Sequence, residues 1–330
     1  MKGDLHLACL VGLAAKALGA SSFAGSELYY AAGLNTTQQE YLFSNLQDSG
    51  IKVLRVWLEA DSTLKGSEPG VWNDEVLNRL DDVMVTAQRY GIKLWISIHS
   101  YNTLLGNGDF YGAWYGTSDF YTNNDAISYF KNRIAHVLSH ANPNNGKTWA
   151  ESPEYIFGFE AQNEADQPNT HPDTTVTWQC TMAQALKTAL RDSPSILVGT
   201  GGGGWVDSSL PTGLFSCAAL DVLAIHAYGA ADLTTTKLGP RVTQAQAAGK
   251  KLILQEWGGA DGGVLDAAAR DANPRSWADA ANQEGIPWMY WQDYEIGVGG
   301  VDWETFQEVA KGTGGYAAAF DFLPWLDGLE

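Results

Sequence analysis

The sequence has little positive charge. Its 330 residues include 20 Lys and Arg against 38 Asp and Glu, a formal net charge of −18. A surface that binds nucleic acid needs a basic patch to meet the phosphates. Nucleic acid is therefore excluded as a partner, and so is an anionic membrane surface. A chain of this charge suits a neutral ligand.

Long hydrophobic runs are also missing. The run near the amino terminus, Leu5–Ala15, is too short to span a bilayer. A lysine precedes it and small residues follow it, which is typical of a secretory leader cleaved around Ala20. We therefore predict a leader over residues 1–20 and a secreted, extracellular protein with no membrane span. A buried amino-terminal helix is the alternative for this segment.

Cysteine is scarce, and no linker divides the chain. Loss of the leader would remove Cys9 and leave Cys180 and Cys217, which fit either one disulfide or two buried thiols. The sequence has no charge block, low-complexity linker or Pro-rich hinge, and 45% of its residues are hydrophobic. Residues 21–330 are therefore predicted to form a single domain with a large core.

Short apolar segments alternate with longer segments of helical periodicity. The predicted helices cover residues 37–50, 76–91, 125–140 and 177–192, and Gly50 and Gly91 are the expected residues just past a helix end. The predicted strands are Leu28–Gly33, Lys52–Leu58, Lys93–His99, Ile156–Gln162, Ser195–Gly199, Val222–His226, Lys251–Gln255 and Pro287–Trp291. Eight apolar strands alternating with helices predict an α/β fold of the (β/α)8 TIM barrel type. A doubly wound open sheet is the alternative.

Polar side chains gather where these strands end, and parallel barrels place their chemistry at that end. A carboxylate and an amide stand side by side after the fourth strand, and a second carboxylate ends the seventh. Arg55 lies inside the second strand, where a guanidinium needs a facing carboxylate. The candidate site residues are Arg55, His99, Asn163, Glu164, His226, Tyr228, Glu256 and Trp291.

Two carboxylates that meet over one barrel mouth suit the acid–base cleavage of a glycosidic bond. One must stay protonated and the other ionised, and Arg55 would hold the second one charged. Asn163 can bind a sugar hydroxyl, and Trp291 offers a flat face to a sugar ring. His226 and Tyr228 can orient the acid and the nucleophile.

These residues, in the segments "VLRVW", "IHAYG", "LQEWGG" and "MYWQ", resemble the shared active-site set of glycoside hydrolase family 5. The resemblance extends from about Phe23 to Asp302. It implies a retaining β-glycosidase of the TIM-barrel clan, with Glu164 as acid/base and Glu256 as nucleophile. The other six candidates would bind substrate. We expect a monomer that acts on a polysaccharide or oligosaccharide and uses no cofactor or metal.

Within the family, "LRVW" and the segment from Phe120 to Asn142 look most like fungal endo-β-1,4-mannanases. Those enzymes usually follow Asn-Glu with Pro-Arg, whereas this chain has Ala165 and Asp166, and the acid could reshape a subsite. His99 is more like the cellulase and glucanase members. β-1,4-Mannan is thus the predicted substrate. A β-1,3/1,4-glucanase, a diglycosidase, a transglycosylase and an inactive carbohydrate-binding barrel are the alternatives.

Overall fold

The computed structural model describes residues 21–58, 68–106, 108–166, 169–228, 231–258, 267–291 and 303–326. Within these ranges, side chains are described from residue 275 onward in the tenth helix and from residue 306 onward in the eleventh. The predicted leader, with Cys9, lies outside the described residues.

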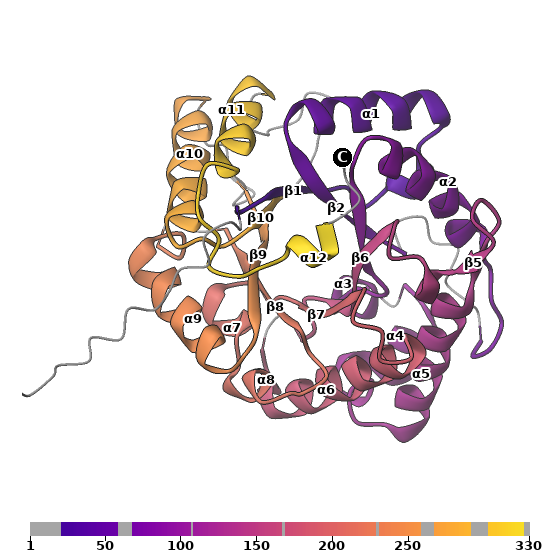
Figure 1. The fold of residues 1–330 in the computed structure, drawn as a ribbon. Coiled ribbons are helices and arrows are strands. Elements are labelled where there is room, and N and C mark those ends of the chain that lie inside the picture. The colour runs from indigo at the N-terminus through magenta and orange to yellow at the C-terminus, as the bar shows by residue number, and fades with distance from the viewer. Residues whose placement is uncertain are drawn as a thin grey trace, which may run out of the picture.

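Eight parallel strands close into a barrel, with helices packed around it (Figure 1), so the predicted (β/α)8 architecture is confirmed. The strand order around the barrel is β1-β10-β9-β8-β7-β6-β3-β2. The strands are β1 Ala24–Glu27, β2 Ile51–Trp57, β3 Lys93–Ser97, β6 Ile156–Asn163, β7 Leu197–Gly201, β8 Val222–Ala227, β9 Lys251–Trp257 and β10 Trp288–Tyr290. A small hairpin, β4 Ala141–Asn142 and β5 Lys147–Thr148, lies outside the barrel.

The longer helices follow the strands in the expected alternation. They are α1 Thr36–Asp48, α2 Glu75–Arg89, α5 Asn124–Ser139, α6 Pro172–Ala189, α9 Thr235–Ala247, α10 Ala267–Gln283 and α11 Trp303–Thr313. Short helices occupy the loops: α3 Tyr101–Leu105, α4 Phe110–Asp119, α7 Val206–Ser209, α8 Thr212–Phe215 and α12 Leu323–Leu326, with 3-10 turns at Ala31–Gly33 and Trp149–Glu151.

Local sequence signals explain where α1 begins and ends. The Asn35 side chain accepts a hydrogen bond from the Gln38 N–H, and the Gln38 side chain accepts one from the Asn35 N–H, so two unpaired helix donors are satisfied. Gly50 just past the helix has φ +78°, and Gly91 past α2 has φ +67°. These left-handed conformations suit glycine and end both helices.

The prediction of the first strand was wrong. The segment Leu28–Gly33 forms a turn and a 3-10 helix, and the strand is the preceding Ala24–Glu27. That strand was overlooked because its residues are small, but their size is what the packing requires. A Cβ on Gly25 would stand 2.7 Å from Met289 Cγ and 2.9 Å from Val53 O, so β1 can approach its neighbours only without that side chain.

The barrel interior is filled by large side chains packed against glycine. Trp95 on β3 is fully buried, and a Cβ on Gly158 or Gly199 would lie within 2.9 Å of its ring. These two positions on β6 and β7 thus leave room for an indole inside the barrel. The Trp95 N–H then donates to Glu160, a buried carboxylate on β6, at 2.6 Å.

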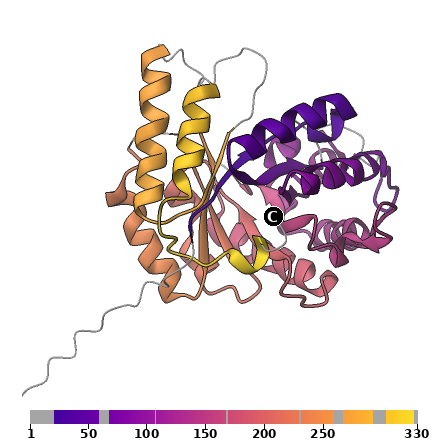
Figure 2. The ribbon, with the colours of Figure 1, turned by 45° about the horizontal axis from the view of Figure 1, so that its top comes forward.

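The carboxyl-terminal segment closes the amino-terminal end of the barrel. Phe322, just before α12, packs edge-on against Phe23 and tilted against Phe157, at ring-centroid distances of 5.6 and 5.9 Å. Lys251 at the start of β9 lies 4.9 Å from the Trp325 ring. Figure 1 looks onto this end, where α12 crosses in front of the strands, and Figure 2 shows the same helix from another side.

Cys180 on α6 and Cys217 after α8 form a disulfide, which resolves the choice that the sequence left open. The two residues are 37 positions apart, and closing such a loop stabilises a fold by about 4 kcal/mol in the chain-entropy model. Among the described residues, none of the helices combines the length and the apolar composition that crossing a bilayer requires.

Candidate active site

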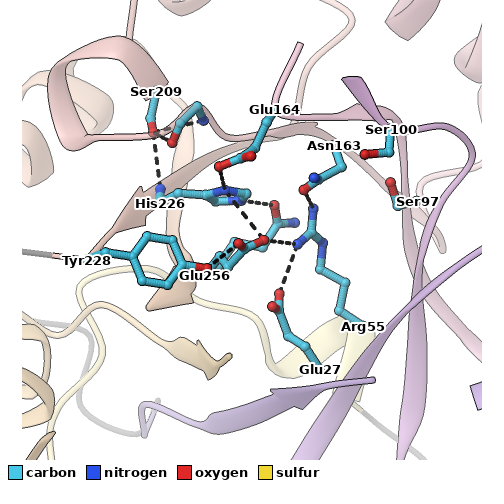
Figure 3. A network of polar contacts seen from close by, with 12 residues as sticks. Glu27, Arg55, Ser97, Ser100, Asn163, Glu164, Ser209, His226, Tyr228 and Glu256 are labelled. Atoms are coloured by element: carbon cyan, nitrogen blue, oxygen red, sulfur yellow. Dashed lines mark hydrogen bonds and ion pairs between the residues drawn. The ribbon is translucent and has the colours of Figure 1, made fainter. Parts of the chain in front are cut away.

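The structure brings Glu164 and Glu256 together at the carboxyl end of the barrel. Glu164 follows β6, and Glu256 is the next-to-last residue of β9. One oxygen of each carboxylate and one ring nitrogen of His226 all lie within 4.8 Å of one another. Figure 3 shows Glu164 and Glu256 on opposite sides of the His226 ring. The two carboxylates that the sequence places at strand ends therefore lie close together and contact the same His226 nitrogen.

Arg55 on β2 lies beneath this pair and is fully buried. Its Nη1 donates to Glu256 Oε2 at 2.9 Å and to Glu27 Oε1 at 3.0 Å, and its Nη2 donates to Glu160 Oε1 and Asn163 Oδ1. A buried guanidinium is tolerated only when it is paired and hydrogen-bonded. The burial and pairing that the sequence analysis required of Arg55 are both present.

Two of these partners were missed by sequence reasoning. Glu27 ends β1 and Glu160 lies within β6, and both are fully buried. Glu160 accepts hydrogen bonds from Arg55, Trp95 and Gln255. Glu27 was hidden by the misplaced first strand. Glu160 follows an apolar run in the segment "IFGFEAQN". A carboxylate there needs a buried cation, and the segment itself contains no Lys or Arg.

Glu256 accepts hydrogen bonds from two donors. Arg55 Nη1 contacts one carboxylate oxygen and the Tyr228 hydroxyl contacts the other. Burial and the nearby Glu256 carboxylate raise the pKa of Tyr228 well above its usual value, so this phenol stays protonated and keeps donating. Glu256 is therefore held by two donors, one of which is a permanent cation.

Glu164 has φ +50°, a left-handed conformation that is uncommon for a residue with a side chain. Its Oε1 lies 3.0 Å from His226 Nδ1. Burial lowers the pKa of His226, but the Glu256 and Glu164 carboxylates outweigh burial and raise it. The same nitrogen lies 3.5 Å from Glu256 Oε2, so the titratable ring contacts both carboxylates, and Glu256 also contacts the permanent cation Arg55.

The orientation of His226 is set by the groups behind it. The Gln255 amide nitrogen donates to Glu160, so the Gln255 carbonyl oxygen faces His226 Nε2, 3.2 Å away, and requires a proton there. Nδ1 is then the nitrogen that shares a proton with Glu164. A Cβ on Gly202 would stand 2.2 Å from His226 Cδ2, so a glycine at this position lets the ring fit.

Direct substrate contact, which was predicted for Arg55, His99 and His226, does not fit the structure. All three are 0% exposed, and each holds another side chain instead. His99 contacts Asp109 Oδ2 through Nε2 and the Gln162 amide nitrogen through Nδ1, both at 2.9 Å. Their position at strand ends was predictable, but their depth below the mouth depends on how far the neighbouring strands extend.

Asn163, Tyr228 and Trp291 lie at the mouth. Asn163 Oδ1 accepts a hydrogen bond from Arg55, so the amide nitrogen of Asn163 is the group that can donate to a ligand. The half-buried Trp291 stacks on Tyr29, which is 41% exposed, and meets the edge of Trp57. These three rings form an aromatic surface beside Arg55, which packs 4.2 Å from the Trp57 ring centre.

Asp166 does not shape a subsite as expected. It is 4% exposed, and its carboxylate accepts hydrogen bonds from the Thr170 hydroxyl and the His171 N–H. The acid therefore holds Thr170 and His171, the two residues directly before α6.

Glu164, His226 and Glu256 also form a group whose ligand atoms could surround a cation. Glu256 already accepts hydrogen bonds from Arg55 and Tyr228, so a cation here would compete with both donors.

Comparison with known proteins agrees with this geometry. The family model described as Cellulase (glycosyl hydrolase family 5) matches residues 18–294. Mannan endo-1,4-beta-mannosidase 5 of Solanum lycopersicum is 31% identical over 151 residues, 42% of this chain and 36% of that protein. Mannan endo-1,4-beta-mannosidase A of Aspergillus aculeatus is 27% identical over 270 residues, 72% of this chain and 69% of that protein.

Solved structures share the fold. An endo-1,4-beta-D-mannanase from Thermotoga petrophila superposes with a TM-score of 0.73 at 22% identity, covering 88% of this chain and 99% of that chain. The endo-1,4-beta-mannanase from Rhizomucor miehei gives 0.70 at 21% identity, covering 89% and 95%. At this level of identity the likeness concerns the barrel architecture.

Proposed function

Because the chain belongs to glycosyl hydrolase family 5, we propose that it is a secreted, monomeric retaining endo-β-glycanase with Glu256 as nucleophile and Glu164 as acid/base. The observation that carries this proposal is the carboxylate pair itself. One oxygen of each carboxylate lies within 4.8 Å of the other, just below the ~5–5.5 Å separation of retaining enzymes and well short of the ~6.5–9.5 Å that an inverting enzyme needs for its water.

In the first step Glu256 attacks the anomeric carbon and Glu164 protonates the departing glycosidic oxygen. The Arg55 and Tyr228 donors hold the Glu256 carboxylate in position before attack. In the second step Glu164, now ionised, takes a proton from water as that water displaces Glu256. His226, which shares a proton with Glu164, is suited to hold the acid in place in both steps.

The proposed substrate is β-1,4-mannan. Its support is that the plant and fungal relatives described above are named mannan endo-1,4-beta-mannosidases. The family model, which is described as Cellulase, keeps β-glucan as the alternative. Secretion is supported by the leader pattern and by the disulfide, a bond that persists in oxidising compartments.

Hydrolysis of mannan, barley glucan and laminarin by the wild-type protein, with product sizing, tests substrate and mode together. Short oligosaccharides from mannan are expected. Release of a single sugar from chain ends would contradict the endo mode. Cleavage of barley glucan alone would show that the substrate is β-glucan and not β-mannan. Binding without cleavage of any polysaccharide would favour an inactive barrel.

Glu256→Ala should lose about 10⁴-fold or more in turnover while remaining folded. Glu164→Ala should chiefly lose activity on glycosides with poor leaving groups, because it supplies the proton. NMR of the first product should show the β-anomer before mutarotation. Release of the α-anomer would contradict double displacement, and loss of activity on adding a chelator would indicate a metal.

A further inference from the structure

The turn that carries Glu164 is strained, and two of its backbone N–H groups donate hydrogen bonds to neighbouring elements. Glu164 and Asp166 both have φ +50°, a left-handed conformation that is unfavourable for residues with a side chain. Such a turn persists only where its surroundings determine it. The Glu164 N–H donates to Gly201 O, and the Asp166 N–H donates to the hydroxyl oxygen of Tyr121, both at 2.9 Å.

Tyr121 begins a chain of hydrogen bonds through the protein interior. Its hydroxyl donates to Gln162 Oε1 at 2.8 Å, and the Gln162 amide donates to His99 Nδ1 at 2.9 Å. His99 Nε2 contacts Asp109 Oδ2, also at 2.9 Å. We refer to Tyr121, Gln162, His99 and Asp109 as the relay. Each of the four is at most 7% exposed.

The donors and acceptors of the relay all point one way. A backbone N–H at Asp166 can only donate, so Tyr121 accepts there and gives its own proton to Gln162. The Gln162 carbonyl is thereby used, its amide donates, and His99 Nδ1 accepts, which leaves Nε2–H to donate to Asp109. If the Gln162 amide were reversed, its NH2 group would face the Tyr121 hydroxyl proton, and two donors would oppose each other. The relay therefore holds one arrangement.

The two titratable ends of the relay keep the protonation that this arrangement needs. Burial raises the pKa of Tyr121 well above its usual value, so its hydroxyl keeps the proton. Burial also raises the pKa of Asp109, but the contacts with His99 and the Gly112 N–H outweigh it and lower the pKa to about 2. Asp109 is thus an ionised acceptor that anchors the relay at the start of α4.

We propose that the relay positions Glu164 for proton transfer, with Tyr121 as the residue that fixes the strained turn. This inference rests on the proposed function, since it assigns Glu164 the role of acid/base. A role in folding alone would not require a buried polar chain, because apolar side chains would fill the same space without the cost of burying polar groups. The relay ends two residues from Glu164, where a small backbone shift moves the carboxylate.

Tyr121→Phe removes only the hydroxyl and keeps the ring that packs 5.1 Å from Phe120 and 5.3 Å from Trp178. The experiment measures kcat/KM for 2,4-dinitrophenyl β-mannobioside and for mannotetraose, or for the cellobiose series if wild type prefers glucan. Mannotetraose cleavage needs the acid, and the dinitrophenolate departs without it. We expect a loss of about 10–100-fold on mannotetraose, part of the full effect of general acid catalysis, and less than about threefold on the activated glycoside.

Gln162→Met breaks the relay at its centre and should produce the same substrate-dependent loss. Tyr90→Phe is the matched control: its hydroxyl donates to Glu40 at 2.6 Å on the outside of the barrel, and its loss should leave both substrates unaffected.

Equal losses on both substrates in Tyr121→Phe and Gln162→Met would overturn the relay proposal and assign these residues to folding. No loss on either substrate would overturn it as well. A wild-type protein that cleaves neither substrate would overturn the proposed function, and the relay proposal would fail with it. The two proposals therefore fail in different ways.

Discussion

The two ends of the barrel are filled by opposite kinds of side chain. At the carboxyl end, Arg55 is buried among Glu27, Glu160 and Glu256, with His226 beside them. At the amino end, the rings of Phe23, Phe157 and Phe322 pack together under α12. The side chains named at both ends are buried, yet one set is charged and the other apolar.

This difference suggests a division of roles, with the carboxyl end of the barrel serving catalysis and the amino end serving stability. Buried ion pairs stabilise a protein weakly, because the desolvation of the charges offsets their attraction. Aromatic packing stabilises reliably, since it removes apolar surface from water and leaves no polar group unpaired. The amino end therefore compensates for a charged mouth that is suited to proton transfer, and substitutions at the two ends should have different consequences.

The largest effect is expected for Arg55→Met. The substitution leaves Glu27, Glu160 and Glu256 buried without their shared cation, and breaking a buried pair costs about 3–5 kcal/mol. kcat/KM should also fall by about 10²–10³-fold, the size of one lost electrostatic contact. Urea unfolding and steady-state kinetics measure the two effects. Unchanged stability would mean that the charged end does not depend on Arg55.

Phe322→Ala should cause a comparable loss of stability with no loss of activity. Phe322 is 4% exposed and contacts two further rings, and truncating a buried Phe costs about 3–5 kcal/mol. At a temperature where the variant stays folded, kcat/KM should match wild type within about twofold. The neighbouring Leu323 is 43% exposed, so Leu323→Ala serves as control and should change stability by about 0.5 kcal/mol or less.

Glu27→Gln should have a smaller effect on stability, of opposite sign. Burial raises the pKa of Glu27 well above 4.5 despite its contact with Arg55. The folded state therefore binds this proton more tightly than the unfolded state, and wild-type stability falls as the pH rises above about 4.5. Glutamine does not titrate. The free energy of unfolding of the variant, measured in urea, should therefore rise relative to that of the wild type between pH 4.5 and 7.5.

Glu40→Gln should show the opposite pH dependence, because the pKa of Glu40 is lowered and that of Glu27 is raised. Contacts with Tyr90 and Arg89 lower the pKa of the half-buried Glu40. Its contribution to stability is therefore present above pH 4.5 and is lost as the pH falls. Relative to the wild type, the stability of this variant should fall over the pH range in which the stability of Glu27→Gln rises. A difference in stability for Glu27→Gln that does not change with pH would contradict the raised pKa of this buried carboxyl.

The smallest effect is expected for Lys251→Met at the amino end. The Lys251 ammonium lies 4.9 Å from the Trp325 ring and 5.8 Å from the Phe322 ring, and such contacts contribute about 0.5–1 kcal/mol. Methionine keeps the apolar packing. A loss as large as that of Arg55→Met would show that the amino end also depends on charge.

Most of the barrel and its mouth were predictable from the sequence. Strand and helix periods, the glycines after α1 and α2, and the polar residues at strand ends located Glu164 and Glu256. Glu27 was missed because the three residues before it in β1 are small and carry no strand signal. Gln162 and Tyr121 were missed because a polar residue in an apolar run and a tyrosine in a loop are common, and only their partners give them a role.

The sequence by itself determined the alternation of elements, and with it which residues stand at one end of a parallel barrel, because local periodicity and the fixed hand of the βα unit leave few other arrangements. The tertiary structure decided which of those residues reach the mouth and which lie beneath it. Depth, charge pairing and the direction of each hydrogen bond arise between strands that are distant in the chain. Arg55 and Glu256, 201 positions apart, acquire their relation only when the barrel closes.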